Sequence, residues 1–269
     1  MKIIEQLVVP KNDKQKSEDG IVITENFVAV IDGSTSKSTR QLSRWRSNGR
    51  YAMKIIADYI KHADKSVDVA RFCREVTAAV RKKYGKKDLE RLALHPEDRL
   101  CASCVVFSRL RREIWMIGDC QCLIGDTLYD NPKPGEAPIA AIRAERAQQL
   151  LDDGTETVES LRENDVAREA IIPELVEGMK GENVDYAVVD GFDIPLSKVR
   201  VLTLNFEPWT VVLASDGYPF LRPTLEESER LLQQQLHDDP LNIHAFKATK
   251  AWRTGNNSFD DRSYVRLEV

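Results

Sequence analysis

The 269-residue sequence lacks any apolar run long enough to cross a membrane, and its first residues lack the basic start and long apolar stretch of a signal peptide. It also lacks an excess of positive charge, because 39 Lys and Arg against 43 Asp and Glu give a net charge of -4. We therefore expect a cytoplasmic protein that binds neither a membrane nor nucleic acid. A hydrophobic content of 42% predicts a sizeable core, and we interpret residues 1–269 as one domain.

Cysteine is scarce, and the odd number of five fits reduced thiols better than a disulfide framework. Four of the five form a CxxC pair, Cys101 and Cys104, and a CxC pair, Cys120 and Cys122. Such pairs can hold zinc, but residues three apart on a strand point to opposite faces, so Cys101 and Cys104 would diverge. We favour packing in the core over a zinc site.

Hydrophobic periodicity predicts both strands and helices. The expected strands cover residues 3–9, 20–24, 26–32, 101–110, 113–130, 199–206, 209–217 and 263–269, with 113–130 forming consecutive hairpins. The expected helices cover about 40–62, 66–84, 136–180 and 224–236, and Pro173 bends or interrupts the third. Strand runs interrupted by helices predict an α+β fold, an antiparallel β-sandwich of two sheets flanked by helices.

Three apolar strands are expected to end in Asp-Gly, at Asp32–Gly33, Asp190–Gly191 and Asp216–Gly217. The pair is a favoured turn, so the pattern alone leaves open whether each site is a turn or a ligand site. What surrounds each pair must decide between the two interpretations.

Acidic residues recur at the expected ends of strands. Asp32 and Asp216 end two strands, residues 260–261 precede the last strand, and residues 18–19 precede the second. Carboxylates at strand ends are suitable hard oxygen ligands for Mg²⁺ or Mn²⁺, and Gly33 would let a backbone carbonyl join them. The lack of a converging histidine argues against zinc.

The segments KSEDG, VAVIDG, IGDCQCLI, VVLASDG and SFDDRSYV, in this order, resemble the motifs of the metal-dependent protein phosphatases of the 2C type. The resemblance covers nearly the whole chain. It implies a central β-sandwich flanked by helices, in agreement with the periodicity. It also implies hydrolysis of phosphate monoesters by water that two Mn²⁺ or Mg²⁺ ions activate.

The resemblance further implies a role for each matching residue. Asp32 would bridge the two ions, with the carbonyl of Gly33 in one coordination shell, while Asp216 and Asp260 would hold the other ion. Glu18 would act through a metal-bound water. These assignments make Asp32, Asp216 and Asp260 the catalytic set.

Two more acids take supporting roles by the same resemblance. Asp19 would steady the ligands without touching an ion, and Asp119 would offer, with Asp216, an optional third metal position. The extra carboxylate of Asp261 has no assigned role, and Asp190 has no metal-binding counterpart, so we assign Asp190–Gly191 to a turn.

The chain departs from the family at two functional positions. Ser34 stands where many members have the histidine that protonates the leaving group, although Ser34 and Ser36 are also candidate helix caps. Lys14 aligns with the arginine that binds the substrate phosphate, and it could pair with phosphate only as a point charge. Lys16 is an alternative, and so is a solvated lysine without a role.

Three hypotheses about function follow. The first is a phosphatase acting on phosphoserine or phosphothreonine in a phosphorylated protein. The second keeps the enzyme but replaces the substrate with a small phosphate ester. The third is a binding protein with a degenerate site. Clustered carboxylates that repel one another without metal favour the enzymes.

Overall fold

The computed structural model describes residues 1–269. Ten strands form two five-stranded antiparallel sheets, the first in the order β1-β10-β9-β6-β7 and the second in the order β2-β3-β4-β5-β8. The strands are β1 Lys2–Val9, β2 Gly20–Ile23, β3 Phe27–Gly33, β4 Ala102–Ser108, β5 Glu113–Ile117, β6 Gln121–Ile124, β7 Thr127–Tyr129, β8 Arg200–Thr203, β9 Thr210–Ala214 and β10 Arg262–Glu268.

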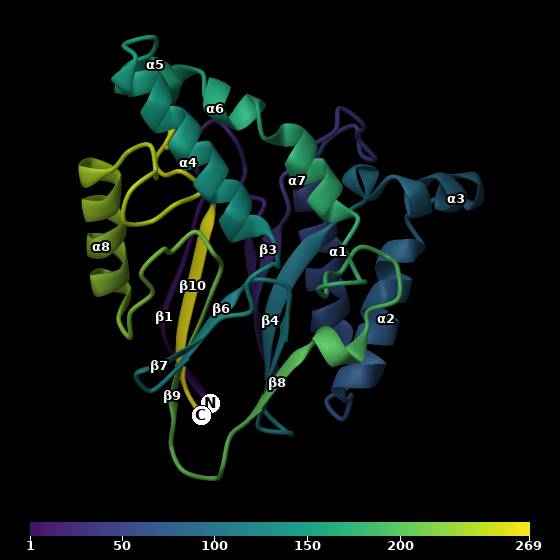
Figure 1. Ribbon diagram of the computed structural model, residues 1–269. Helices are drawn as coiled ribbons and strands as arrows, with labels where there is room; N and C mark the ends of the chain where they lie inside the picture. Colours follow the sequence, from purple (N-terminus) through teal and green to yellow (C-terminus); the bar gives the residue numbers. More distant parts are fainter.

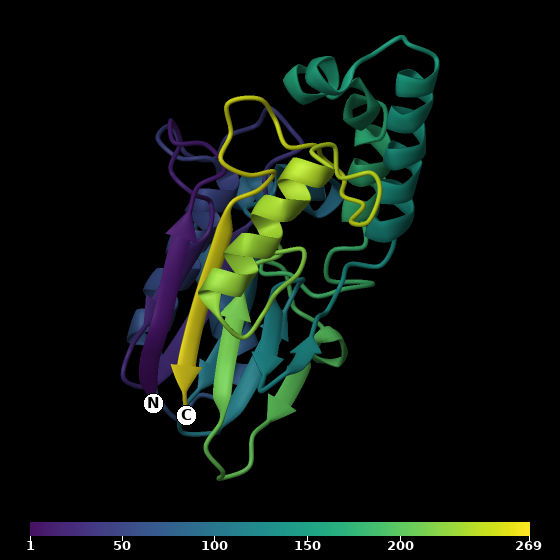
Figure 2. The ribbon, with the colours of Figure 1, turned by 90° about the vertical axis from the view of Figure 1, so that its left-hand side faces the viewer.

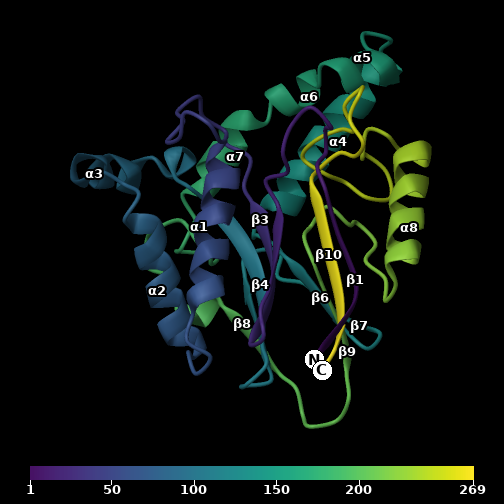
Figure 3. The same ribbon diagram turned by 180° about the vertical axis from the view of Figure 1, so that it is seen from behind.

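Eight α-helices surround the sheets. They are α1 Asn48–His62, α2 Val69–Arg81, α3 Lys86–Leu94, α4 Glu136–Asp152, α5 Val158–Glu163, α6 Val166–Glu169, α7 Ile172–Met179 and α8 Leu225–Asp238. Helices α1 and α2 flank one side of the sandwich and α8 the other, while α4 to α7 lie at the end far from the two termini (Figure 1). The view from behind shows the same arrangement (Figure 3). The predicted α+β sandwich is confirmed. None of these helices is both long and apolar enough to span a bilayer.

The unbroken apolar run of β3 before Asp32 results from burial of both faces of the strand. Phe27, Ala29 and Ile31 pack with α1 and α2, whereas Val28 and Val30 pack between the two sheets. Because successive side chains of a strand point to opposite faces, a strand covered on both faces must be apolar throughout. Asp32 is the first carboxylate of the strand, and it emerges where the two layers end.

Strands β1 and β10 bring the two ends of the sequence together. They pair from Lys2 opposite Glu268 to Val9 opposite Arg262. The loop that follows β1 and the long loop that precedes β10 therefore meet at the end of the sandwich that carries α4 to α7 (Figure 2). This end holds the predicted acidic residues.

The helix expected from about residue 40 begins only at Asn48, and its N-cap is Ser47. Neither Ser34 nor Ser36 caps it, so the capping interpretation of these two serines is wrong. The residues before the helix are held in a loop by the Asn48 side chain, which accepts from the amide of Leu42 at 3.0 Å and donates to the carbonyl of Arg40 at 2.9 Å.

Three other expectations need correction. Residues 136–180 form four helices, and Pro173 lies in the first turn of α7 instead of bending a longer helix, because proline needs no amide partner there. Strands β5 and β6 belong to different sheets, so the chain crosses the sandwich at Gly118, whose φ is +87°. Val189 forms only an isolated bridge with Ala102, and no strand precedes Asp190. Helix α3 was not expected.

Candidate active site

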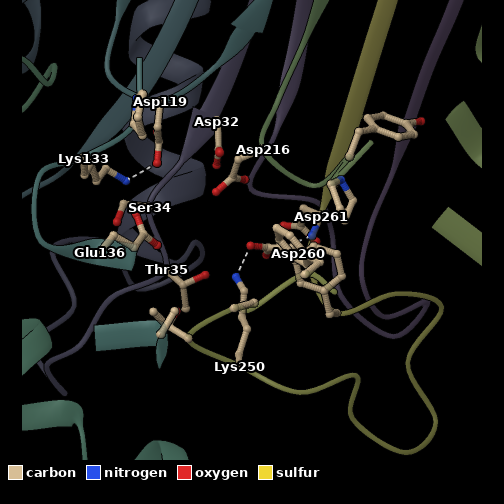
Figure 4. Close-up of a pocket in the computed structure, with 18 of the residues that line it drawn as sticks. Asp32, Ser34, Thr35, Asp119, Lys133, Glu136, Asp216, Lys250, Asp260 and Asp261 are labelled. Atoms are coloured by element: carbon tan, nitrogen blue, oxygen red, sulfur yellow. Dashed lines mark hydrogen bonds and ion pairs between the residues drawn. The ribbon is translucent and has the colours of Figure 1, made fainter. Parts of the chain in front are cut away.

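A cavity of about 370 Å³ opens at the end of the sandwich, between the strand ends and α4. Five predicted carboxylates line it together with Gly33: Asp19, Asp32, Asp119, Asp216 and Asp260. Figure 4 shows the carboxylates of Asp32 and Asp216 close to each other at its centre. The fold thus brings together acids from five separate segments of the chain.

Glycines allow the backbone segments to approach this closely. A Cβ atom added to Gly217 would lie 2.2 Å from the carbonyl oxygen of Asp261, and one added to Gly33 would lie 2.4 Å from the carbonyl oxygen of Gly49. No other residue type fits at such distances. The Asp-Gly pairs at Asp32 and Asp216 therefore serve chain packing as well as placing a carboxylate.

The central carboxylates lie in an unfavourable electrostatic environment. Burial, followed by the charges of Asp19, Asp216 and Asp119, raises the pKa of Asp32 well above its usual value. Burial, together with nearby Asp261 and Asp216, raises the pKa of Asp19 to about 7 although Ser215 opposes the shift. Ionising Asp19 and Asp32 together is therefore unfavourable without a compensating charge, and a bound cation would supply that charge.

Asp119 has a cationic partner. Lys133 Nζ lies 2.5 Å from Asp119 Oδ2, and Ser103 Oγ donates to Asp119 Oδ1 at 2.6 Å. Burial opposes ionisation of Asp119, but Lys133 outweighs it and lowers the pKa of the carboxyl. Both oxygens of Asp119 thus have partners within the protein.

Asp260 has two cationic partners. Lys250 Nζ contacts Oδ2, and Lys11 Nζ lies 3.4 Å from Oδ1. Lys11 Nζ also donates to Thr35 Oγ1 at 3.0 Å and lies 3.7 Å from Glu18 Oε2. Burial and the neighbouring Lys11 lower the pKa of Lys250 to about 7.

Asp261, for which the sequence gives no role, holds the loop that follows β1. Its Oδ1 accepts from the amide of Lys11 at 2.6 Å, and its Oδ2 accepts from the amide of Glu18 at 2.7 Å. The carboxylate positions the acidic pair through the backbone. Its neighbour Asp260 is left to face Lys11 and, as Figure 4 shows, Lys250.

The acidic pair itself is divided between two hollows. Asp19 lines the cavity, whereas Glu18 lines an adjacent hollow and accepts from Thr35 Oγ1 at 2.7 Å. Asp19 is 3% exposed and Glu18 7%, yet Asp19 Oδ2 and Glu18 Oε1 have no hydrogen-bond partner. A buried carboxylate oxygen without a partner is costly, so each of these atoms fits a ligand that the protein does not itself supply.

The predicted phosphate-binding lysine does not reach the cavity. Lys14 is exposed, and its amide donates to Asn12 Oδ1. Lys16, the alternative, borders the adjacent hollow with Arg50. The same loop instead directs Lys11 toward the acids.

Sequence reasoning missed every lysine at the site. Lys37, Lys133 and Lys250 line the cavity, as does Arg168 on α6, and Lys11 reaches Asp260 from outside the cavity lining. Each is a single basic residue in a loop or short helix, and such residues carry no motif or periodicity. Their position depends on loops that only the folded chain brings together.

Ser34 lies beside Lys133 and Glu136 on the cavity wall (Figure 4). Its amide donates to the carbonyl of Cys101 at 3.0 Å, which fixes the backbone directly after the Asp32–Gly33 pair. The residue therefore borders the space that a substrate could occupy.

The remaining sequence candidates are structural. Cys104, Cys120 and Cys122 are buried in the hydrophobic core, as the packing interpretation expects. Asp190 is fully buried and lies 2.7 Å from Arg99 Nη1, while Gly191 has a φ of +87°. Asp190–Gly191 is a bend locked by an ion pair.

In the conformation described, no three His, Cys, Asp or Glu side chains are grouped so that they could hold a metal ion. The donor chemistry nevertheless fits a hard divalent cation. Asp19, Asp32 and Asp216 are oxygen donors without an ammonium partner, and one oxygen of buried Asp19 has no partner at all.

No protein-family model matches the sequence. No curated protein matches it either. Solved structures do match over nearly the whole chain. PppA of Pseudomonas aeruginosa is 11% identical, covers 98% of this chain and 96% of its own, and has a TM-score of 0.50.

Two further structures score slightly lower. The catalytic domain of the serine/threonine protein phosphatase PstP with two manganese ions is 14% identical over 98% of this chain and 97% of that chain, with a TM-score of 0.47. RsbX with magnesium is 12% identical over 98% and 96%, with a TM-score of 0.48. At these identities the likeness concerns the fold, and the two-sheet sandwich expected from the resemblance to the 2C-type phosphatases is the fold of this chain.

Proposed function

We propose that this chain is a Mn²⁺- or Mg²⁺-dependent phosphatase that hydrolyses phosphoserine or phosphothreonine monoesters in proteins. One observation carries the proposal: Asp19, Asp32 and Asp216 meet without ammonium partners on the floor of a cavity whose wall carries lysines. An acidic floor suits a divalent cation, and a basic wall suits the phosphate that the cation would contact.

Asp32 and Asp216 would hold the cation, with the carbonyl of Gly33 and the unpartnered oxygen of Asp19 as further donors. A bound Mn²⁺ or Mg²⁺ would supply a lowered pKa for attacking water and charge neutralisation on the phosphate. Asp119 would instead hold Lys133 in position on the cavity wall.

The wall would bind the phosphate. Lys37 and Arg168 line the cavity, and Lys37 Nζ is fixed by donating to the carbonyl of Thr35 at 2.9 Å. Burial and the charge of Arg168 lower the pKa of Lys37 to about 8. Below that pH the ammonium form predominates, and it can pair with a phosphate oxygen. Ser34 Oγ would donate to the leaving oxygen.

The test is hydrolysis of p-nitrophenyl phosphate and of a panel of phosphopeptides, measured against Mn²⁺ concentration. Asp32→Asn and Asp216→Asn should each lower the rate by several orders of magnitude while the fold survives. Asp126→Asn, in the exposed turn between β6 and β7, is the matched control and should keep the wild-type rate. Wild-type turnover in both site variants would exclude the proposal.

Two observations favour a second candidate, a phosphate-binding protein without catalysis. The carboxylates as they stand are not grouped to hold a metal ion, and Asp260 is already paired with lysines. Calorimetric binding of a phosphopeptide, without hydrolysis at millimolar Mn²⁺, would support this candidate. Faster turnover of a small phosphate ester than of any phosphopeptide would instead indicate a metabolite phosphatase.

A further inference from the structure

Lys11 lies between Asp260, which the family resemblance assigns to a metal ion, and Glu18, which it assigns to a metal-bound water. Its Nζ is 3.4 Å from Asp260 Oδ1 and 3.7 Å from Glu18 Oε2. The side chain is 20% exposed, and Thr35 Oγ1 at 3.0 Å also holds the ammonium group in place. A cation of this chain's own thus lies between the two acids.

Lys250 contacts the other carboxylate oxygen of Asp260. It belongs to the loop before β10, lines the cavity, and contacts Asp260 Oδ2 (Figure 4). Asp260 therefore has one lysine on each carboxylate oxygen. When both lysines are protonated, the two ammonium groups carry together the charge of one divalent ion, and they must be displaced before a metal can use this carboxylate.

At Asp119, the optional third metal position, the carboxylate oxygens also have partners within the chain. Lys133 Nζ is 2.5 Å from one oxygen of Asp119, and Ser103 Oγ is 2.6 Å from the other. A metal ion at Asp119 would have to replace both partners.

The central carboxylates lack such partners. Asp19, Asp32 and Asp216 have no ammonium or guanidinium nitrogen within 4.0 Å, in contrast to Asp119 and Asp260. Asp19 Oδ2 is buried, borders the cavity and has no hydrogen-bond partner. These three neighbouring carboxylates are therefore not paired with any cation of the chain.

Resting on the metal-dependent function proposed above, we infer that this chain holds a single divalent cation, at Asp19, Asp32 and Asp216, and that Lys11 and Lys250 supply at Asp260 the charge of a second ion. An ammonium group can neutralise a phosphate oxygen but cannot accept a water molecule as a ligand. The lysines would thus replace only the electrostatic part of a second ion's contribution.

The experiment counts ions on the full-length chain. Equilibrium dialysis against Mn²⁺ gives the stoichiometry, and electron paramagnetic resonance separates an isolated Mn²⁺ from two neighbouring, magnetically coupled ions. We expect one uncoupled Mn²⁺ in the wild type and a coupled pair in the Lys11→Met/Lys250→Met double variant. Lys250→Arg, which keeps the charge, and Lys247→Met, a cavity lysine without a carboxylate partner, should both keep one ion.

Circular dichroism checks that each variant is folded. If the double variant does not fold, the single variant Lys250→Gln is used in its place. Two coupled ions in the wild type overturn the inference but leave the phosphatase proposal intact. A folded charge-removed variant that still binds only one ion also overturns it. Absence of any bound Mn²⁺ overturns both the inference and the metal-dependent function.

Discussion

Asp119 and Asp260 each have ammonium partners, whereas Asp32 and Asp19 have only burial and nearby acids. The same side-chain type therefore has opposite properties within one cavity. Lys133 lowers the pKa of Asp119, while burial and the neighbouring acids raise the pKa of Asp19 and Asp32.

The central acids predict how the stability of the metal-free protein depends on pH. The pKa of Asp19 is raised to about 7 in the folded protein, compared with about 4 for an unperturbed aspartate. The folded state then binds more protons than the unfolded state between these values. The free energy of unfolding should therefore fall as pH rises from about 4 to 7.

Urea denaturation with a chelator, at several pH values in this window, measures that slope. Asp19→Asn should flatten it, because the variant has no titrating group at this position. A stability that rises steadily across the window would contradict the raised pKa. Excess Mn²⁺ should reduce the loss, since the ion favours the deprotonated carboxylates.

Ser34 gives a prediction about the leaving group. General acid catalysis contributes about 10² to 10⁴ in rate, and most when the departing oxygen is strongly basic. If the proposed phosphatase lacks a strong acid at Ser34, it should prefer aryl phosphates over alkyl phosphates. Ser34→His should then raise kcat on alkyl phosphates more than on aryl ones.

The measurement is kcat against leaving-group pKa for the wild type and Ser34→His. Equal slopes would show that another group already supplies the proton. Loss of a helix cap cannot account for an effect, because Ser47 caps α1.

Among the elements, the junction between the end of β9 and the start of β10 depends most on one residue. Gly217→Ala would place a Cβ atom 2.2 Å from the carbonyl oxygen of Asp261, so the two segments must separate. We expect a loss of about 1–3 kcal/mol in the free energy of unfolding, the usual cost of overpacking. Mn²⁺ affinity should fall as well, because Asp216 moves with the strand end.

Chemical denaturation with and without Mn²⁺ checks this prediction. Gly178→Ala in α7 is the control, since the nearest atom to its added Cβ would be Ile139 Cδ1 at 4.0 Å. That substitution should be neutral or slightly stabilising, because alanine favours helix over glycine. A Gly217→Ala variant as stable as the control would mean that the two segments can separate at little cost in free energy.

Much of the element pattern could be predicted from the sequence, because alternating burial leaves a clear signal. The run that ends at Asp32 is apolar since both faces of β3 are covered, and α2 places Phe72 and Val76 on one face. The start of α1 could not be predicted, since it depends on hydrogen bonds between the Asn48 side chain and the loop directly before the helix. The cavity acids were foreseeable from motifs, but the lysines opposite them were not, because loop packing leaves no periodic trace.

At the scale of the whole molecule, the predicted cation binds where three separate chain segments meet. Binding should therefore stabilise the native state against global unfolding, by about 2.7 kcal/mol when the free ion is at one hundred times its Kd. Calorimetry should show a melting temperature that rises with Mn²⁺ concentration. An unchanged melting temperature at millimolar Mn²⁺ would argue for the binding protein without metal.

Asp190→Asn tests, in the same assay, whether Asp190 supports the fold or takes part in catalysis. Its carboxylate pairs with buried Arg99, so removing the charge should lower the melting temperature with or without Mn²⁺. Below that temperature, the rate per folded molecule should match the wild type. A variant that retained full stability but lost turnover would place this Asp-Gly pair in the chemistry.

The two hydrogen bonds of Asp261 also set an order of events during biosynthesis. They join residues separated by 250 and 243 positions, so each closes a loop of almost the whole chain. Glu18 and Lys11 leave the ribosome long before residue 261, but they cannot be positioned until that residue has emerged. The second sheet, whose last strand ends at Thr203, can form earlier, whereas the acidic floor is assembled only after residue 261 is available.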